Sequence, residues 1–164
     1  MMYIPRSFQQ TDQTIIFDLM RRFNFATLFS QHGDVPQATS LPFMLDENRG
    51  EQGMLLAHFA RANPHWRQLD STKEVLVVFQ GAHAYISPSY YANQTAVPTW
   101  NYAQVQVWGK PRLLHEPAQL RPLVEALSWQ HENGRLPAWD VANAELLMEK
   151  FLKAIVGLEI EMTR

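Results

Sequence analysis

The sequence contains no cysteine, and this one absence removes several kinds of chemistry. A chain without thiols forms no disulfide bond, builds no zinc–thiolate site and has no thiolate nucleophile. Its seven glycines are scattered, and they form neither a phosphate-binding loop nor the fingerprint of dinucleotide-binding proteins. The pattern of a serine nucleophile elbow is missing as well. The sequence therefore assigns no catalytic residue, since no general acid or base stands out.

An excess of positive charge is also missing. Fourteen Lys and Arg against 16 Asp and Glu give a formal net charge of -2, which provides no electrostatic footprint for nucleic acid. The first residues, Met-Met-Tyr-Ile-Pro-Arg, lack the apolar core of a signal peptide, and no apolar run is long enough to span a bilayer. We therefore expect a cytoplasmic protein that does not cross a membrane.

The composition that is present favours a folded β protein. Of the 164 residues, 46% are apolar and 12% aromatic, enough for one domain over residues 1–164. Hairpin patterns dominate, and the long strand–helix rhythm of a parallel sheet is missing. The sequence predicts a mainly β fold, a small antiparallel barrel with flanking helices. We expect strands over 25–31, 37–45, 53–59, 74–80, 101–109, 112–115 and 156–164, and helices over 11–23, 60–69, 117–132 and 142–154.

The stretch from Gly81 to Tyr102 has an unusual composition. Four tyrosines and a tryptophan lie among Ser, Thr, His and Asn, while Pro88 and Pro98 hold the backbone extended and remove ladder donors. Aromatic faces beside short hydrogen-bonding side chains suit a flat ligand with polar edges. The alternative is a well-packed aromatic loop that covers the core.

A candidate anion pocket lies between a strand that ends near His58 and a helix expected to begin near Asn63. Free amides at the helix start, together with Arg61 and His58, would hold a phosphate through charge-assisted hydrogen bonds. The alternative is an ordinary capped helix with a surface arginine. Thr39 and Ser40 add hydroxyls to this pocket if the second and third strands pair. Otherwise they are cross-strand hydroxyls on an exposed face.

Metal binding is not predicted. Four histidines raise the question, but they form no close pair on one helix face, and no Asp or Glu accompanies them at a diagnostic spacing. These are His32, His58, His65 and His83. A haem ligand among them stays open, although no attachment motif supports it. Glu159 and Glu161 alternate along the last strand, and we expect both carboxylates to be solvated on its outer face.

Several of these segments together resemble one family over essentially the whole chain: the PaiB-type FMN-binding negative transcriptional regulators. Two of the matching runs are long and unusual in composition. The match rests on Met2-Tyr-Ile-Pro, Phe25-Ala-Thr-Leu, Leu41-Pro42, His58-Phe-Ala-Arg-Ala-Asn-Pro-His-Trp66, His83-Ala-Tyr-Ile-Ser-Pro-Ser-Tyr-Tyr91 and Val97-Pro-Thr-Trp-Asn-Tyr102.

The resemblance implies an FMN-binding split barrel, similar to the pyridoxamine-phosphate oxidases, that forms a homodimer with FMN in a groove between subunits. By motif position, His58, Arg61 and Asn63 would hold the flavin phosphate, with Trp66 in the same motif. The remaining expected contacts come from two other segments: Thr39, Ser40 and Leu41 beside the isoalloxazine or ribityl chain, and Trp100, Asn101 and Tyr102 from the other subunit or the barrel rim.

The resemblance also implies a role as a negative regulator of transcription. Contact with DNA follows from that role, although the charge and the absence of a basic recognition helix favour indirect regulation. Two alternatives stay open: a flavin-dependent oxidase or reductase on the same scaffold, and a haem-handling or cofactor-free dimer. Family members usually continue with a Lys-x-Ser-Gln-Asn-Arg-like segment, whereas this chain stops at Met162-Thr163-Arg164. The resemblance therefore predicts that the C-terminal family segment is missing.

Overall fold

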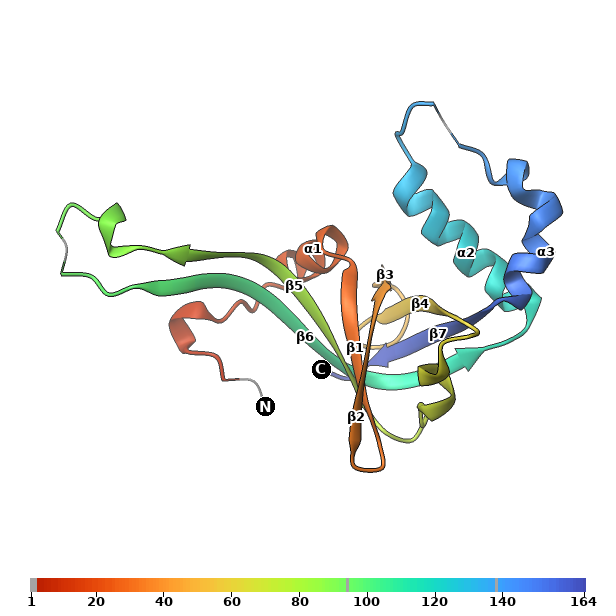
Figure 1. Ribbon diagram of the computed structural model, residues 1–164, viewed down its shortest axis with the longest axis horizontal. Coiled ribbons are helices and arrows are strands. Elements are labelled where there is room, and N and C mark those ends of the chain that lie inside the picture. The colour runs from red at the N-terminus through yellow and green to blue at the C-terminus, as the bar shows by residue number, and fades with distance from the viewer. Residues whose placement is uncertain (1–2, 94, 138) are drawn as a thin grey trace.

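One curved antiparallel sheet dominates the computed structural model, which describes residues 3–93, 95–137 and 139–164 (Figure 1). Within these residues the strand order is β2-β1-β5-β6-β7-β4-β3. The strands are β1 (Phe25–His32), β2 (Val35–Pro42), β3 (Met44–Asp46), β4 (Met54–Ala60), β5 (Val75–Ile86), β6 (Thr99–Leu114) and β7 (Ile155–Met162). The helices are α1 (Gln13–Arg22), α2 (Pro117–Glu132) and α3 (Glu145–Lys153), with short 3-10 turns η1 (Arg6–Phe8), η2 (Pro64–Gln68), η3 (Pro88–Tyr90) and η4 (Val141–Ala144).

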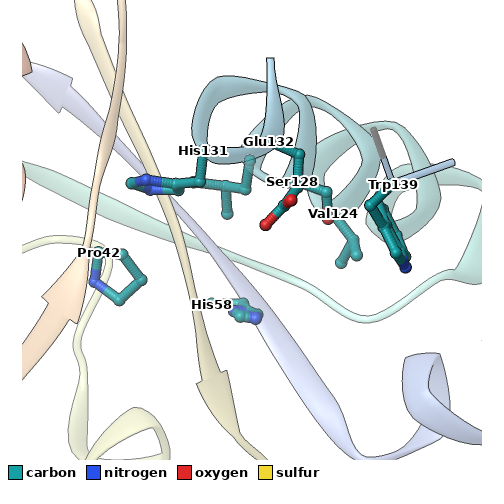
Figure 2. A pocket seen from close by; sticks show the side chains of 8 residues that line it. Pro42, His58, Val124, Ser128, His131, Glu132 and Trp139 are labelled. Carbon is teal, nitrogen blue, oxygen red and sulfur yellow. The ribbon is translucent and has the colours of Figure 1, made fainter. Parts of the chain in front are cut away.

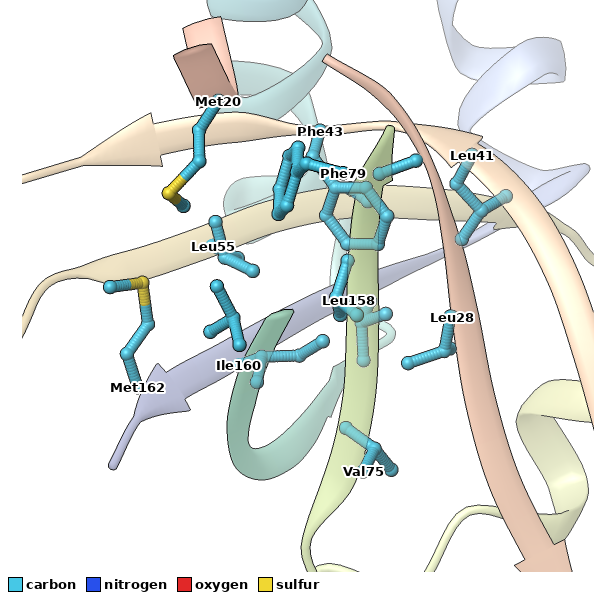
Figure 3. Close-up of a cluster of buried hydrophobic side chains, with 14 of the residues drawn as sticks. Met20, Leu28, Leu41, Phe43, Leu55, Val75, Phe79, Leu158, Ile160 and Met162 are labelled. Carbon is cyan, nitrogen blue, oxygen red and sulfur yellow. The ribbon is translucent and has the colours of Figure 1, made fainter. Parts of the chain in front are cut away.

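The curved sheet encloses one main hydrophobic core. Alternate residues of β7, such as Leu158 and Ile160, are fully buried and meet Leu28 of β1, Leu41 of β2 and Phe79 of β5 (Figure 3). Strands from both ends of the sheet therefore enclose one interior. The predicted mainly β fold with flanking helices is confirmed.

The helices cover two different parts of this sheet. Helix α1 buries Phe17 and Met20 in the main core. On the other side, Leu123 and Leu127 of α2 pack against Leu56 of β4. Helix α2 has the bounds that the sequence predicts, because Pro117 is well placed in a first helical turn and the helix ends at Asn133. No helix in the described part of the chain is long and apolar enough to cross a membrane.

Strand β6 is longer than expected, because the break expected between strands over 101–109 and 112–115 does not exist. Gly109 pairs with Met162 and Pro111 with Ile160, so the strand continues to Leu114. A Cβ atom on Gly109 would lie 2.5 Å from Ile160 Cγ2. Glycine is needed here for the close approach of β7, and not for a turn.

The stretch from Gly81 to Tyr102 forms the outer half of a β-hairpin that projects from the barrel (Figure 1). Its strands are the continuations of β5 and β6, with Tyr85 opposite Trp100 and a register shift between Gln80 and His83. We call this segment, residues 83–102, the hairpin arm. Its tyrosines and Trp100 are exposed, so the alternative of an aromatic loop packed over the core is wrong.

The last strand holds a buried charge that the sequence analysis placed in solvent. The side chain of Glu159 is only 7% exposed, and it pairs with Arg49 at 2.9 Å and with Arg112. The expectation of a solvated Glu159 is therefore wrong, because two arginines from neighbouring segments cover the outer face of β7 at this point. Glu161 is exposed, as expected.

Candidate functional site

A buried histidine organises the polar residues beside η2. His65 is 3% exposed, and its backbone amide donates to Asn63 Oδ1 at 2.9 Å. Its ring Nδ1 lies 2.8 Å from Thr39 Oγ1, and its Nε2 lies 2.7 Å from Ser30 Oγ. Asn63 Nδ2 donates to Thr39 Oγ1 at 3.4 Å. The turn after β4 is thereby tied to both strands of the β1–β2 hairpin.

These contacts are compatible with one chain of hydrogen bonds through a neutral His65 ring. Because Thr39 Oγ1 accepts from Asn63, its own proton is available to His65 Nδ1, and Nε2–H then donates to Ser30. Burial lowers the pKa of His65, which favours this neutral ring. The Thr39 hydroxyl is thus held in one orientation by the turn, as expected for a preorganised binding group.

Arg61 has a structural role that the sequence analysis did not foresee. Its Nε donates to Lys153 O and one Nη to Ile155 O, both at 2.7 Å, so it covers the end of α3. Its backbone carbonyl accepts from Trp66 Nε1 at 3.0 Å. The helix expected over residues 60–69 is only the five-residue η2 (Pro64–Gln68). The role of Arg61 in holding a phosphate stays a prediction.

Strand alternation separates the three residues expected on β2. Thr39 and Leu41 point to one face and Ser40 to the other. The Leu41 side chain is 7% exposed and lies in the main core. Ser40 Oγ lies 3.0 Å from Thr27 Oγ1 directly across the strand pair, which is the cross-strand arrangement weighed as the alternative. Of these three residues, Thr39 is the one whose side chain contacts the segment predicted to bind phosphate, through Asn63 and His65.

A cavity opens on the other side of β4, between His58 and α2 (Figure 2). Its volume is about 400 Å³, and an adjoining cavity of about 350 Å³ continues towards α3. Four residues line both parts: His58, Val124, Ser128 and Trp139. His58 Nδ1 is buried and has no hydrogen-bond partner among the described residues, and burial lowers the pKa of this ring.

The last group of expected site residues lies far from these features. Trp100, Asn101 and Tyr102 are exposed on the hairpin arm, with Trp100 58% and Tyr102 68% accessible. From Trp100 to Val107, where β6 becomes buried, the strand runs roughly 23 Å at about 3.3 Å per residue. Within one chain, Thr39 contacts Asn63, and Trp66 contacts the backbone of Arg61. His58 faces the cavity on the other side of β4, and the arm residues lie apart from both groups.

Ser30, the role of His65 and the α2 wall of the cavity were not predicted from the sequence. A signal for His65 was present, because Asn-Pro-His places the histidine where an Asn side chain accepts from its amide. Ser30 and α2 are distant in sequence from the motif, so only the folded structure joins them to it.

Comparison with known proteins assigns the chain to a family. Residues 2–164 match the family described as "Putative FMN-binding domain". The chain belongs to this FMN-binding family. It is 36% identical to the "Protease synthase and sporulation protein PAI 2" of Bacillus subtilis (strain 168), over 98% of this chain and 77% of that protein. It is 31% identical to protein YKL070W of Saccharomyces cerevisiae, over 82% of this chain and 92% of that protein.

Solved structures share the fold at low sequence identity. The flavocytochrome Anf3 from Azotobacter vinelandii has a TM-score of 0.67 and 14% identity, covering 98% of this chain and 69% of its own. The FAD and heme binding protein from Mycobacterium smegmatis has a TM-score of 0.66 and 18% identity, covering 94% and 68%. The predicted PaiB-type family, split-barrel fold and FMN cofactor are confirmed.

The residues beside η2 fit the polar parts of FMN. The Thr39 hydroxyl is oriented by His65, Asn63 contributes an amide, and Arg61 has N–H groups beyond the two bound to carbonyls. His58 lines the cavity on the other side of β4 and is not part of this group, so its contact with the flavin phosphate stays a prediction. Bound FMN would supply redox chemistry at its ring system, while these protein groups bind and orient it.

Proposed function

We propose that this protein is a homodimeric FMN-binding regulator of transcription of the PaiB type, in which each flavin lies between two copies of the chain. The observation that carries this proposal is the separation of the expected flavin residues into two groups. Thr39 and Asn63 lie beside η2 and Arg61 just before it, whereas Trp100 and Tyr102 are exposed on the arm. A second copy provides the means to unite an arm with the η2 region of its partner.

The exposed surface of the arm supports the same arrangement. Soluble proteins rarely leave several large aromatic side chains together in solvent unless the patch binds something. The arm exposes such a set, and it is rigid because the ladder of β5 and β6 continues into it. The exposed aromatic residues of the arm are Tyr85, Tyr90, Tyr91, Trp100 and Tyr102.

Regulation by this dimer is indirect in our proposal, through a small molecule or a protein partner. The formal net charge is -2, and six of the ten arginines pair with carboxylates, so the chain has no excess of positive charge for a phosphate backbone. The arginines paired with acidic side chains are Arg21, Arg22, Arg49, Arg112, Arg121 and Arg164.

A complementation experiment tests the shared site. One variant carries Trp100→Ala with Tyr102→Ala on the arm, and a second carries Asn63→Ala beside η2. We expect each variant alone to lose most of its FMN. After the two are unfolded, mixed and refolded, about a quarter of all sites should regain flavin, because half of randomly paired dimers are mixed and each contains one intact site.

Flavin released from the mixture is measured by absorbance and identified by chromatography, and light scattering gives the oligomeric state. A mixture that retains no more flavin than its components would contradict a site built from two chains, as would a monomeric wild-type protein. The exposed Tyr3→Ala variant serves as a control for loss of surface aromatic area. Retardation of duplex DNA at physiological salt would contradict indirect regulation.

A further inference from the structure

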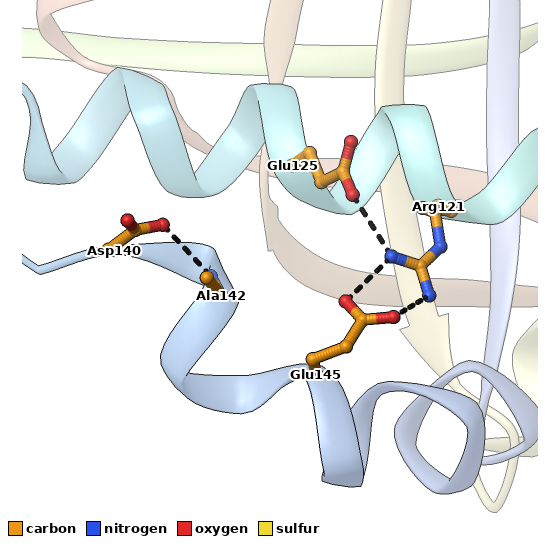
Figure 4. Close-up of polar contacts among 5 residues, drawn as sticks. All are labelled: Arg121, Glu125, Asp140, Ala142 and Glu145. Atoms are coloured by element: carbon orange, nitrogen blue, oxygen red, sulfur yellow. Dashed lines mark hydrogen bonds and ion pairs between the residues drawn. The ribbon is translucent and has the colours of Figure 1, made fainter.

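The cavity between His58 and α2 has walls that are formed within one chain. Helices α2 and α3 are joined by Arg121, whose Nη atoms donate to the Glu145 carboxylate at 3.0 and 2.9 Å and to Glu125 at 3.4 Å (Figure 4). This hydrogen bonding lowers the pKa of Glu145. Behind the ion pair, Leu120 of α2 packs with Met148 and Leu152 of α3. The cavity is therefore preformed, as ligand sites usually are.

Its lining is apolar with few polar groups. Val124, Leu127 and Trp139 line the outer part, and the inner part continues between Met148 and Leu152. Aromatic and aliphatic walls of this kind suit a flat apolar molecule. The volume of about 400 Å³ leaves ample room for a bicyclic ring with a short side chain.

The charge of the residues that line the cavity favours a cationic ligand over an anionic one. Glu132 contributes a carboxylate, and no Lys or Arg is among the described residues that line either part of the cavity. Within residues 3–93, 95–137 and 139–164, no ion pair involves Glu132. A ligand cation near this carboxylate would gain an attraction, whereas an anion would be repelled.

His58 supplies the polar complement inside the cavity. The ring is held neutral by its lowered pKa, so one of its nitrogens is a hydrogen-bond acceptor. Its Nδ1 is buried without a partner among the described residues, which is unfavourable unless a hydrogen-bond donor satisfies it. A rotation of the ring about its Cβ–Cγ bond exchanges the two edges, so a ligand N–H in the cavity has an acceptor available.

We propose that this cavity binds a flat aromatic amine: an apolar ring with an N–H donor for His58 and an ammonium group for Glu132. This ligand chemistry differs from that of FMN, whose phosphate is anionic. The site lies on the opposite side of β4 from the Thr39–His65 cluster, so it does not depend on the proposed regulator function or on bound flavin.

Three indole compounds of different charge test the proposal on the purified protein by calorimetry. Tryptamine carries an ammonium group, indole is neutral, and indole-3-acetate is an anion. We expect tryptamine to bind about two- to fivefold more tightly than indole, with indole-3-acetate weakest, from the strength of a partly exposed ion pair. Benzofuran, which lacks the N–H, should bind about three- to tenfold more weakly than indole.

Variants assign these differences to residues. Glu132→Gln should remove the preference for tryptamine and leave indole unchanged, whereas Glu149→Gln on the exposed face of α3 should keep the preference. His58→Phe should remove the difference between indole and benzofuran. Val124→Trp should fill the cavity and abolish binding of all three indoles, with thermal unfolding used to verify that the variant is folded.

Several results would overturn the proposal. These are equal affinity for the cationic, neutral and anionic indoles, binding that survives Val124→Trp, or displacement of one FMN for each tryptamine bound. The last result would mean that the cavity is part of the flavin site. A protein that binds tryptamine as expected but never retains FMN would refute the proposed function and leave this inference intact.

Discussion

Replacing Arg61 by alanine distinguishes a structural arginine from a phosphate ligand. In the structure its guanidinium spans from the end of β4 to the carbonyls of Lys153 and Ile155, the residues that lead from α3 into β7. The substitution should therefore destabilise the protein even without FMN. A residue that acts only on a flavin phosphate would lower flavin retention and leave the apoprotein unchanged.

The size of the effect follows from the two hydrogen bonds. Each has a charged donor at 2.7 Å, and such bonds contribute about 1.5 to 3 kcal/mol. Arg61 is half-buried, so we take the lower value and expect a loss of about 3 kcal/mol in the free energy of unfolding. For a chain of this length that corresponds to a fall in Tm of about 6 to 12 °C. Arg61→Lys should lose roughly half as much, because an ammonium group lacks the guanidinium fork.

Urea unfolding of the apoprotein, followed by tryptophan fluorescence, measures these values. Arg67→Ala is the matched control: this arginine lies 4.5 Å over the Trp66 ring and is exposed, so its loss should cost about 0.5 kcal/mol. If Arg61→Ala is no more destabilising than Arg67→Ala, the carbonyl contacts do not stabilise the fold and the reasoning fails. The effect of the phosphate contacts on flavin retention is better tested with Asn63→Ala, because this variant should be less destabilised than Arg61→Ala.

Three further substitutions or conditions test other parts of the structure. Glu159→Gln should lower the unfolding free energy by about 2 kcal/mol in urea, because it leaves two arginines without their buried partner, whereas the exposed Glu161→Gln should change it little. Gly109→Ala should cost about 3 kcal/mol or more by overpacking the β6–β7 pair, and Gly33→Ala, at a φ of 60° with open space around it, about 1 kcal/mol; equal melting temperatures would contradict this. Burial lowers the pKa of His65 below 6.5, so the unfolded chain takes up the proton first, and stability should be full above pH 6.5 and fall as the pH drops towards the folded-state pKa. Urea midpoints between roughly pH 5 and pH 7.5 measure this slope, which should be smaller in His65→Gln.

Local patterns predicted those elements whose own residues determine them. The bounds of α2 follow from its proline start and its apolar stripe, and the alternation of apolar residues in β7 follows from the packing of Val156, Leu158 and Ile160 inside the barrel. Gly109 and Pro111 led to a wrong prediction, because Gly and Pro usually mark a turn. Here β7 approaches Gly109 too closely for a side chain. The partner strand that decides this lies about 50 residues further along the chain.

The site was predictable only as far as one segment supplies it. The run from His58 to Trp66 contains the cap, the arginine and the buried histidine. The direction in which Arg61 points depends on α3, and the orientation of Thr39 depends on His65. Sequence spacing carries no information about either contact, because each joins segments that only tertiary packing brings together.

Strand β7 has a consequence for how the sheet is assembled. It pairs with β6 on one side and with β4 on the other, and within the described residues it is the element that joins β2-β1-β5-β6 to β4-β3. Until these late residues are in place, the earlier strands form two separate ribbons, each with an open edge. During synthesis the open edges of both ribbons are therefore exposed to pairing with other chains. Truncation of the chain just before Ile155 would leave two separate ribbons instead of a smaller barrel.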